Sequence, residues 1–232
     1  MTHNESELAT IYDQRFRGKQ NYRNRVWRVL IDDFIEPYVP SDAAVLDIGC
    51  GYGEFINNIR CRTKFGMDMN PDTARLLSPD VQFLQQDCST AWNLPRASLD
   101  VIFTSNFFEH LPNKQALDST LEQAFCSLNP GGKLIALGPN IKYLPGAYWD
   151  FWDHYLPLTE MSLTEGLRIH GFEVIRCVDR FLPYTMAHGI QYPIFFLKLY
   201  LKIPLAWRFL GKQFFLVAQK PNGGLDPVKN SP

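Results

Sequence analysis

The sequence predicts an open α/β sheet with a nucleotide-type ligand site. Residues 44–48 form a short apolar run that leads directly into the glycine turn Gly49-Cys50-Gly51-Tyr52-Gly53, after which a helix is expected to open at about Tyr52. Further short apolar runs alternate with segments of helical spacing, which is the pattern of βαβ units. The chain of 232 residues is long enough for one large α/β domain and short for two.

The charges beside this turn predict the kind of ligand. A dinucleotide loop carries a third glycine at the position of Glu54 and leaves a helix N-terminus for the pyrophosphate. Here Glu54 and Asp47 flank the turn with two carboxylates, which would repel a diphosphate. They suit a cationic ligand with a nucleoside end, so the sequence favours S-adenosylmethionine. An NAD-dependent enzyme is the disfavoured alternative.

The segment Leu-Asp-Ile-Gly-Cys-Gly-Tyr-Gly at 46–53 resembles the first motif of class I S-adenosylmethionine-dependent methyltransferases. Other landmarks of that family recur in the same order from about residue 40 to 220. The resemblance implies a Rossmann-like, seven-stranded, mostly parallel sheet of order 3-2-1-4-5-7-6, with an antiparallel last strand and helices on both faces. It also implies a methyl-transferring enzyme.

Composition narrows the function classes further. Hydrophobic residues make up 46% and charged residues 20% of the chain, as in ordinary globular proteins. A net charge of −1 gives no support to nucleic-acid binding. Five scattered cysteines without a C-x-x-C pair favour a reducing, cytoplasmic compartment. The polar N-terminus predicts no signal peptide, and no apolar run reaches the ~18 to 20 residues that span a bilayer.

The expected organisation is an N-terminal helical cap (1–36), one methyltransferase domain (37–220) and a flexible tail (221–232). Apolar residues recur at helical spacing over 21–36, which predicts a helix that caps one edge of the sheet and ends at Pro37. Tyr12 precedes it. Because similar leaders in the family fold over the cofactor, Tyr12 either covers the cofactor or anchors this segment to the core.

The next two strands are expected to supply the nucleoside contacts. After a helix over about 53–62, strand 64–68 ends in Asp68, about 20 residues after Asp47, the spacing at which a carboxylate reaches ribose hydroxyls. The alternative for Asp68 is turn chemistry before Asn70-Pro71. A short helix over 72–77 precedes strand 81–85. The resemblance implies that Asp87 accepts from the adenine amino group; otherwise it caps a turn. The full set expected at the cofactor is Asp47, Gly49, Cys50, Gly51, Gly53, Asp68, Met69, Asp87, Cys88, Asn106 and Tyr12.

The fourth strand (98–104) leads into a loop that contains Asn106 and His110 and resembles the family's post-strand loop. Ligands in open α/β sheets bind at the carboxyl ends of strands, so His110 is a candidate base for methyl transfer. Its alternative role is structural, with the ring bonded to a backbone carbonyl. A helix over 113–127, a tight turn at 129–132 and a fifth strand over 133–137 follow, and the Pro-Gly-Gly before that strand matches the family.

Residues 143–155 are rich in aromatics and are the candidate acceptor wall, or else core. His154 is the second candidate base, with Asp150 and Asp153 able to orient it; its alternative is an exposed turn. These three residues lack a convincing ligand spacing, so no metal is expected. Cys50 and Cys88 are expected to be small neutral loop residues and not nucleophiles.

A helix is expected from Thr159 to about 170, with strands at 171–175 and 213–218. The connection at about 180–212 is long for an antiparallel pair, which favours a functional insert. Within it, residues 192–204 are apolar except for Lys198 and Lys202, which lie on one helical face. This helix packs on the core, closes the substrate pocket, or contacts lipid at the inner membrane face. Similar inserts occur in methyltransferases linked to bacterial surface polysaccharides.

Together these features predict in-line methyl transfer to a small molecule or glycan, with an oxygen acceptor favoured over nitrogen. In-line displacement needs mainly a close, collinear nucleophile, and a base only if a proton must leave. The segment Ser105-Asn106-Phe107-Phe108 lacks the prolines found at this point in DNA and protein-glutamine amino methyltransferases. A non-catalytic cofactor-binding partner or sensor is the alternative function.

Overall fold

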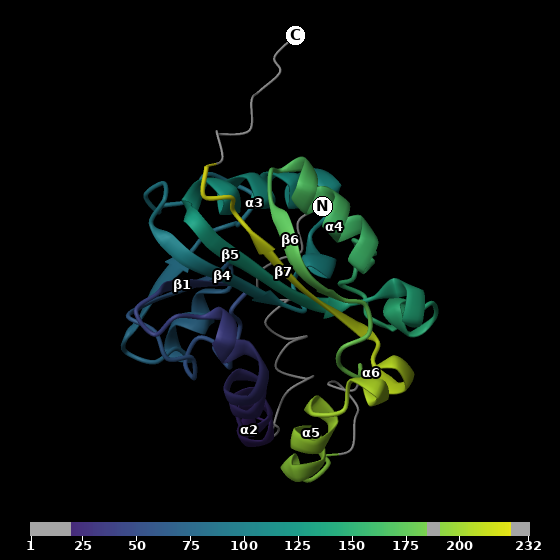
Figure 1. Ribbon diagram of the computed structural model, residues 1–232. Helices are drawn as coiled ribbons and strands as arrows, with labels where there is room; N and C mark the ends of the chain where they lie inside the picture. Colours follow the sequence, from purple (N-terminus) through teal and green to yellow (C-terminus); the bar gives the residue numbers. More distant parts are fainter. Residues whose placement is uncertain (1–19, 185–190, 224–232) are drawn as a thin grey trace.

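The computed structural model describes residues 20–184 and 191–223. Within them, seven strands form one sheet of order β3-β2-β1-β4-β5-β7-β6 (Figure 1). The strands are β1 (Ala44–Ile48), β2 (Thr63–Asp68), β3 (Val81–Gln85), β4 (Leu99–Ser105), β5 (Leu128–Pro139), β6 (Glu173–Val178) and β7 (Gln213–Gln219). Strands β1 to β5 pair in parallel, and β7 runs antiparallel to both β5 and β6. The predicted fold class and strand order are therefore confirmed.

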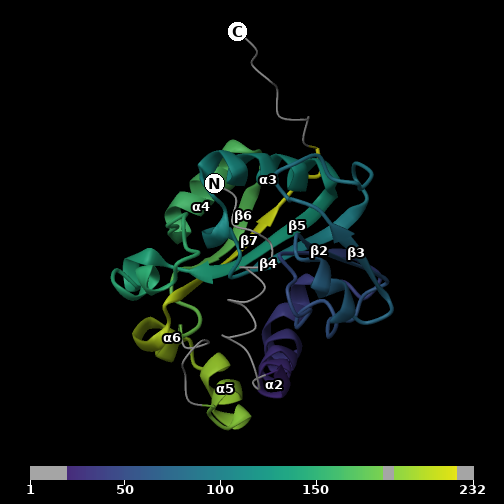
Figure 2. The ribbon, with the colours of Figure 1, turned by 180° about the vertical axis from the view of Figure 1, so that it is seen from behind.

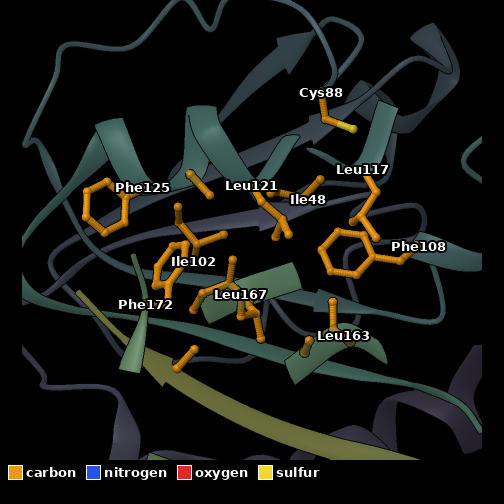
Figure 3. Packing of buried hydrophobic residues seen from close by; sticks show 14 of the residues in the cluster. Ile48, Cys88, Ile102, Phe108, Leu117, Leu121, Phe125, Leu163, Leu167 and Phe172 are labelled. Atoms are coloured by element: carbon orange, nitrogen blue, oxygen red, sulfur yellow. The ribbon is translucent and has the colours of Figure 1, made fainter. Parts of the chain in front are cut away.

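Helices cover both faces of this sheet, as the 180° view in Figure 2 also shows. Helices α3 (Lys114–Ser127) and α4 (Glu160–Ile169) lie on one face, where Leu46, Ile102 and Leu216 of the strands point. Their apolar side chains interlock with those of the sheet (Figure 3). Helices α2 (Gln20–Leu30), α5 (Ile194–Leu201) and α6 (Pro204–Leu210) pack on the other face, against Val45 and Phe215. Neighbouring residues of each strand thus serve opposite layers, as the strand repeat requires.

Side-chain caps set the starts of two helices close to where the sequence predicts them. The Asn113 side chain accepts a hydrogen bond from the Ala116 N–H (2.9 Å) at the start of α3. Thr159 and Ser162 form a reciprocal capping box at the start of α4. No helix in the described part of the chain is both long enough and apolar enough to cross a bilayer.

The N-terminal helix differs from the prediction. It ends at Leu30 and continues as a π-helical turn (Ile31–Ile35) and a 3₁₀ turn (Glu36–Tyr38), instead of running to 36 as one helix. It covers a face of the sheet and not an edge, because the Trp27 ring packs edge-on against Phe55 (centroids 6.4 Å apart) and Phe103 (5.8 Å) over the central strands.

The helix expected over 53–62 is absent, and turns occupy its place. The Asn58 side chain donates to the Glu54 carbonyl (2.8 Å), the group that a helix would offer to the Asn58 N–H. The Asn57 side chain meanwhile accepts from the Ser78 N–H (2.8 Å). Asparagine side chains that bond to the backbone in this way compete with the helix, which explains the error.

Three smaller predictions also change. The helix expected at 72–77 is a 3₁₀ helix, Pro71–Arg75. The turn at 129–132 lies inside β5, with Gly131 at a φ of +78°. The helix expected over 192–204 is shorter and spans only Ile194–Leu201 (α5), and a second helix, α6, begins at Pro204. They are separated at Ile203, whose backbone is extended (φ −121°, ψ 83°) because Pro204 follows.

Candidate active site

A cleft of about 900 Å³, open to solvent, lies at the carboxyl ends of β1 and β4. This is where ligands bind in open α/β sheets. Its lining comes from α2, the glycine turn after β1, the segment after β4, the loop that follows β5 and Tyr184. Of the predicted residues, Asp47, Gly49, Cys50, Gly51, Asn106, His110 and His154 line it.

The glycine turn is anchored to the neighbouring strand by its own backbone. The N–H groups of Gly49 and Cys50 donate to the Met67 carbonyl (2.9 and 3.1 Å). A Cβ on Gly49 would lie 2.2 Å from the Phe107 ring, so packing requires glycine there. At Gly51, by contrast, φ is +48° and a Cβ would face open space in the cleft. Only a residue without a side chain keeps that space for a ligand.

The electrostatics of the turn differ from the prediction in one respect. Glu54 forms a buried ion pair with Arg23 of α2 (2.6 Å), so part of its charge is offset within the protein. Burial raises the pKa of Asp47 well above its usual range, and Glu54 and Asp68 raise it further. A cation bound beside Asp47 would favour its ionised form. The preference for a positive ligand therefore depends mainly on Asp47 and Asp68, because Glu54 is paired with Arg23.

Asp68 lies at the tip of β2, beside the glycine turn. Its Oδ2 accepts from the Gly51 N–H and its Oδ1 from the Asn70 N–H, both at 2.9 Å. Burial raises its pKa, and these backbone bonds oppose the rise. The carboxylate thus fixes the turn; it does not line the cleft, and its contact with a ribose stays a prediction. Met69, which follows it, is half exposed at 50%.

Asp87 and Cys88, after β3, have structural contacts. Asp87 Oδ1 accepts from both the N–H and the hydroxyl of Ser89 (2.8 and 2.7 Å), which is the turn-capping role considered as its alternative. Its other oxygen has no hydrogen bond to any described residue. The Cys88 thiol lies 3.3 Å from the Thr120 hydroxyl in the core (Figure 3). Tyr12 lies outside the described residues.

The two cysteines near the cleft are poor nucleophiles. Burial raises the pKa of the Cys50 thiol far above its usual value and that of Cys88 to about 12. Thiolates, and not thiols, carry out nucleophilic chemistry. Their role as small neutral residues agrees with these shifts.

His110 is held by Asp153, which lies on the loop after β5. Its Nδ1 is 2.7 Å from the Asp153 carbonyl oxygen and 3.3 Å from Oδ2 of the same residue. A carbonyl only accepts, so Nδ1 carries the proton, and in the neutral ring Nε2 carries the lone pair. The Asp153 backbone carbonyl thus orients the ring, and the Asp153 carboxylate lies close enough to stabilise a protonated ring. The alternative role of His110, a hydrogen bond from its ring to a backbone carbonyl, is also present, because Nδ1 bonds to the Asp153 carbonyl.

His154 is buried, at 5% exposure, and is not in an exposed turn. Its Nδ1 lies 2.9 Å from the Tyr148 carbonyl oxygen, and its ring stacks on Phe151 (centroids 4.9 Å apart). The rings of His154 and His110 meet edge to face, with centroids 5.0 Å apart. His154 therefore packs behind His110 and supports it.

Backbone bonds fix this loop against the segment after β4. The Glu109 carbonyl accepts from the N–H groups of Tyr155 (2.8 Å) and Leu156 (3.0 Å). The Glu109 side chain lines the cleft although it is almost fully buried, and burial raises its pKa to about 8. It is therefore an uncharged carboxyl at neutral pH.

The predicted aromatic wall is only partly assembled. Phe151 lines the cleft, together with Tyr184, which the sequence analysis did not single out. Tyr148 belongs to the core, where its hydroxyl donates to the Leu156 carbonyl (2.6 Å). Trp149 and Trp152 are exposed at 56% and 77%. Which aromatic side chains of this irregular loop are buried and which are exposed could not be predicted from its composition.

Glu109, His110 and His154 each offer a ligand atom within 4.8 Å of the other two. Two imidazoles and a carboxylate are a donor set that divalent metals use. The sequence analysis considered a different set, Asp150, Asp153 and His154. The expectation of a metal-free site stays a prediction, and chelation tests it below.

Arg23 and Trp27 also line the cleft and were missed. They lie four residues apart on α2 and so face the same side. Their spacing in the sequence indicates that both side chains lie on one side of a helix. The tertiary structure shows that this side of α2 borders the cleft. The Trp27 indole N–H is buried and has no hydrogen-bond partner among the described residues. A buried, unpaired donor at a cleft favours a bound acceptor group.

A family model for a methyltransferase domain matches residues 20–176. The chain belongs to this methyltransferase family. S-adenosylmethionine is its cofactor. The cleft has features that suit this molecule: open space at Gly51, the Asp47 carboxyl in its lining, and a Trp27 indole N–H without a partner among the described residues.

Solved structures of similar fold agree with the family. The methyltransferase resembles an S-adenosylmethionine-dependent methyltransferase of Archaeoglobus fulgidus with a TM-score of 0.65 at 19% identity, over 91% of this chain and 99% of the other. It resembles a methyltransferase of Haloferax volcanii, solved with the Trm112 methyltransferase activator, with a TM-score of 0.67 at 17% identity (95% and 99% covered). A Thermotoga maritima protein described as a possible histamine N-methyltransferase gives 0.65 at 16% (92% and 96%). The sequence has no significant match among curated proteins.

Proposed function

We propose that the methyltransferase transfers a methyl group to a hydroxyl of a small molecule or saccharide. The observation that carries this proposal is the His110–Asp153 pair in the same cleft as the glycine turn. A hydroxyl must lose its proton as it is methylated, whereas an amine that is already deprotonated needs no base in the transfer step. An oriented imidazole at the acceptor side is therefore more useful to an oxygen nucleophile.

The protein's own residues divide the work between holding the cofactor and handling the proton. Asp68 and the open Gly51 corner receive the nucleoside, and Asp47 lies beside the positive charge. When bound, S-adenosylmethionine supplies a methyl group on a positively charged sulfur. Phe151 and Tyr184 position the acceptor through ring contacts, which suit sugar and aromatic faces. The acceptor proton passes to Nε2 of His110, and Asp153 stabilises the resulting imidazolium.

We propose the cytoplasm as the compartment and a small molecule as the acceptor. All five cysteines are free, as expected in a reducing environment. The net charge of −1 supplies no general attraction to nucleic acid. The Haloferax volcanii relative was solved with a protein activator, so the purified methyltransferase should be assayed alone and with its host's lysate.

Methyl release on a panel of sugars, phenols and amines tests the proposal, alongside calorimetric titration of the cofactor. His110→Asn should lower kcat on hydroxyl acceptors about 10²- to 10⁴-fold and leave cofactor affinity unchanged. His170→Asn, at the end of α4 and away from the cleft, is the matched control. Turnover restricted to amines, with His110→Asn as active as the parent, would refute oxygen methylation. Metabolite profiling of a deletion strain would then identify the acceptor, as a species lighter by one methyl group.

A further inference from the structure

Helices α5 and α6 carry a group of large apolar side chains that no described residue covers. On one side, Leu201 and Trp207 are buried, and Ile194, Leu197 and Tyr200 pack against the core shared with α2. The opposite side carries exposed Phe195 (68%), Phe196 (55%) and Phe209 (77%). Leu199, Ile203, Leu205 and Leu210 are exposed with them. We call these seven exposed residues the α5–α6 surface.

The α5–α6 surface is held rigidly. The Tyr200 hydroxyl donates to the Phe181 carbonyl, and the Trp207 indole N–H donates to the Tyr200 carbonyl (2.8 Å). Helix α5 also lies beside α2 in both views of the molecule (Figures 1 and 2). Because the inner sides of both helices already fill the core, the outer aromatics cannot be buried by a simple shift of either helix.

The charged side chains of residues 191–212 are all positive. Residues 191–212 contain Lys198, Lys202, Arg208 and Lys212, all exposed, and no Asp or Glu, whereas the whole chain has a net charge of −1. Exposed aromatic and leucine side chains bordered by cations are the pattern of interfacial helices on anionic membranes. Contact between two copies of the surface is disfavoured, since it would bring two sets of like charges together.

We propose that the α5–α6 surface binds peripherally to a membrane rich in anionic phospholipid. Phe195, Phe196 and Phe209 would enter the boundary between headgroups and acyl chains, while Lys198 and Lys202 contact the phosphates. The structure therefore favours lipid contact over the two other roles considered for this insert. Docking on the core accounts only for the inner sides, and neither α5 nor α6 lines the cleft that a lid would close.

Co-sedimentation of the full-length protein with vesicles tests this inference without cofactor or acceptor, so its result is independent of the proposed reaction. Vesicles of phosphatidylcholine with phosphatidylglycerol should bind the parent protein, and pure phosphatidylcholine should bind it much less. Phe195→Ser with Phe196→Ser should lower the partition coefficient about 100-fold, because two large apolar side chains are lost. Lys198→Gln with Lys202→Gln should lower it by about 10- to 30-fold and reduce its dependence on salt.

The matched control is Met161→Ser with Ile169→Ser, which removes two equally exposed apolar side chains (62% and 72%) from α4 on the opposite face of the sheet. It should bind vesicles like the parent, and circular dichroism should confirm that every variant is folded. Absence of parent binding to anionic vesicles would overturn the inference. An equal loss of vesicle binding in the α4 control would also overturn it. So would a parent protein that is a dimer and does not bind vesicles, if the Phe195→Ser, Phe196→Ser variant is a monomer.

Discussion

Asp68→Ala is expected to weaken cofactor binding by about 1 to 3 kcal/mol. In the proposed site its carboxylate accepts from a ribose hydroxyl, and a hydrogen bond to a charged group contributes roughly this amount. The dissociation constant should rise about 5- to 150-fold. Part of the loss would come through Gly51, because Oδ2 holds that N–H at 2.9 Å in the protein itself. The binding penalty alone therefore does not separate ribose contact from support of the turn.

Calorimetry with two ligands separates these contributions. S-adenosylhomocysteine should show the full penalty in Asp68→Ala, whereas its 2′,3′-dideoxy analogue should show only the smaller part that comes through the Gly51 turn. Asp80→Ala is the control, since Asp80 is an exposed carboxylate that pairs with Lys64 (2.9 Å) on the opposite end of β2. An unchanged affinity in Asp68→Ala would remove Asp68 from the site. An equal penalty with both ligands would assign it to the turn alone.

Three further results are expected. Burial raises the pKa of Glu109 from its usual 4.5 to about 8, so the folded state keeps a proton that the unfolded state loses. The free energy of unfolding of the parent should therefore fall relative to Glu109→Gln by up to about 1.4 kcal/mol per pH unit between pH 4.5 and 8. Unfolding free energies from urea titrations that depend on pH equally in the two proteins would contradict this. Trp27→Phe removes a donor that has no partner among the described residues, so thermal stability should hold while the cofactor Kd or the acceptor KM rises up to about tenfold. Unchanged values of both would exclude a ligand contact. Chelation with EDTA should leave turnover unchanged, and activity restored by a divalent metal would instead make Glu109, His110 and His154 a metal site.

The strands and capped helices were predictable because their signals are local. A buried parallel strand such as β1 is a short apolar run, and the caps at Asn113 and Thr159 are single side chains. The errors arise where distant groups compete with the local pattern. The apolar residues of 53–62 recur at helical spacing. The Asn57 side chain nevertheless bonds to Ser78, before β3, and the Asn58 side chain bonds to the Glu54 carbonyl, which a helix would use.

The glycine turn that lines the cleft was similarly predictable, because it is one continuous stretch of sequence. Cofactor contacts by Asp68 and Asp87 at the tips of the neighbouring strands stay predictions.

The acceptor side of the cleft was not predictable. His110 and Asp153 are far apart in the sequence, and backbone bonds to the Glu109 carbonyl help to bring their loops together. The ion pair of Glu54 depends on Arg23, which lies on α2, before β1 in the sequence.

The sequence by itself determined the sheet, the glycine corner and the class of cofactor, because each depends on residues that are neighbours along the chain. Tertiary structure alone decided which carboxylates keep their charge, which histidine meets an orienting aspartate and which side of α5 remains exposed. Each of those outcomes is a matter of burial or of contact between distant segments, and a linear pattern does not encode the partner that a side chain finds.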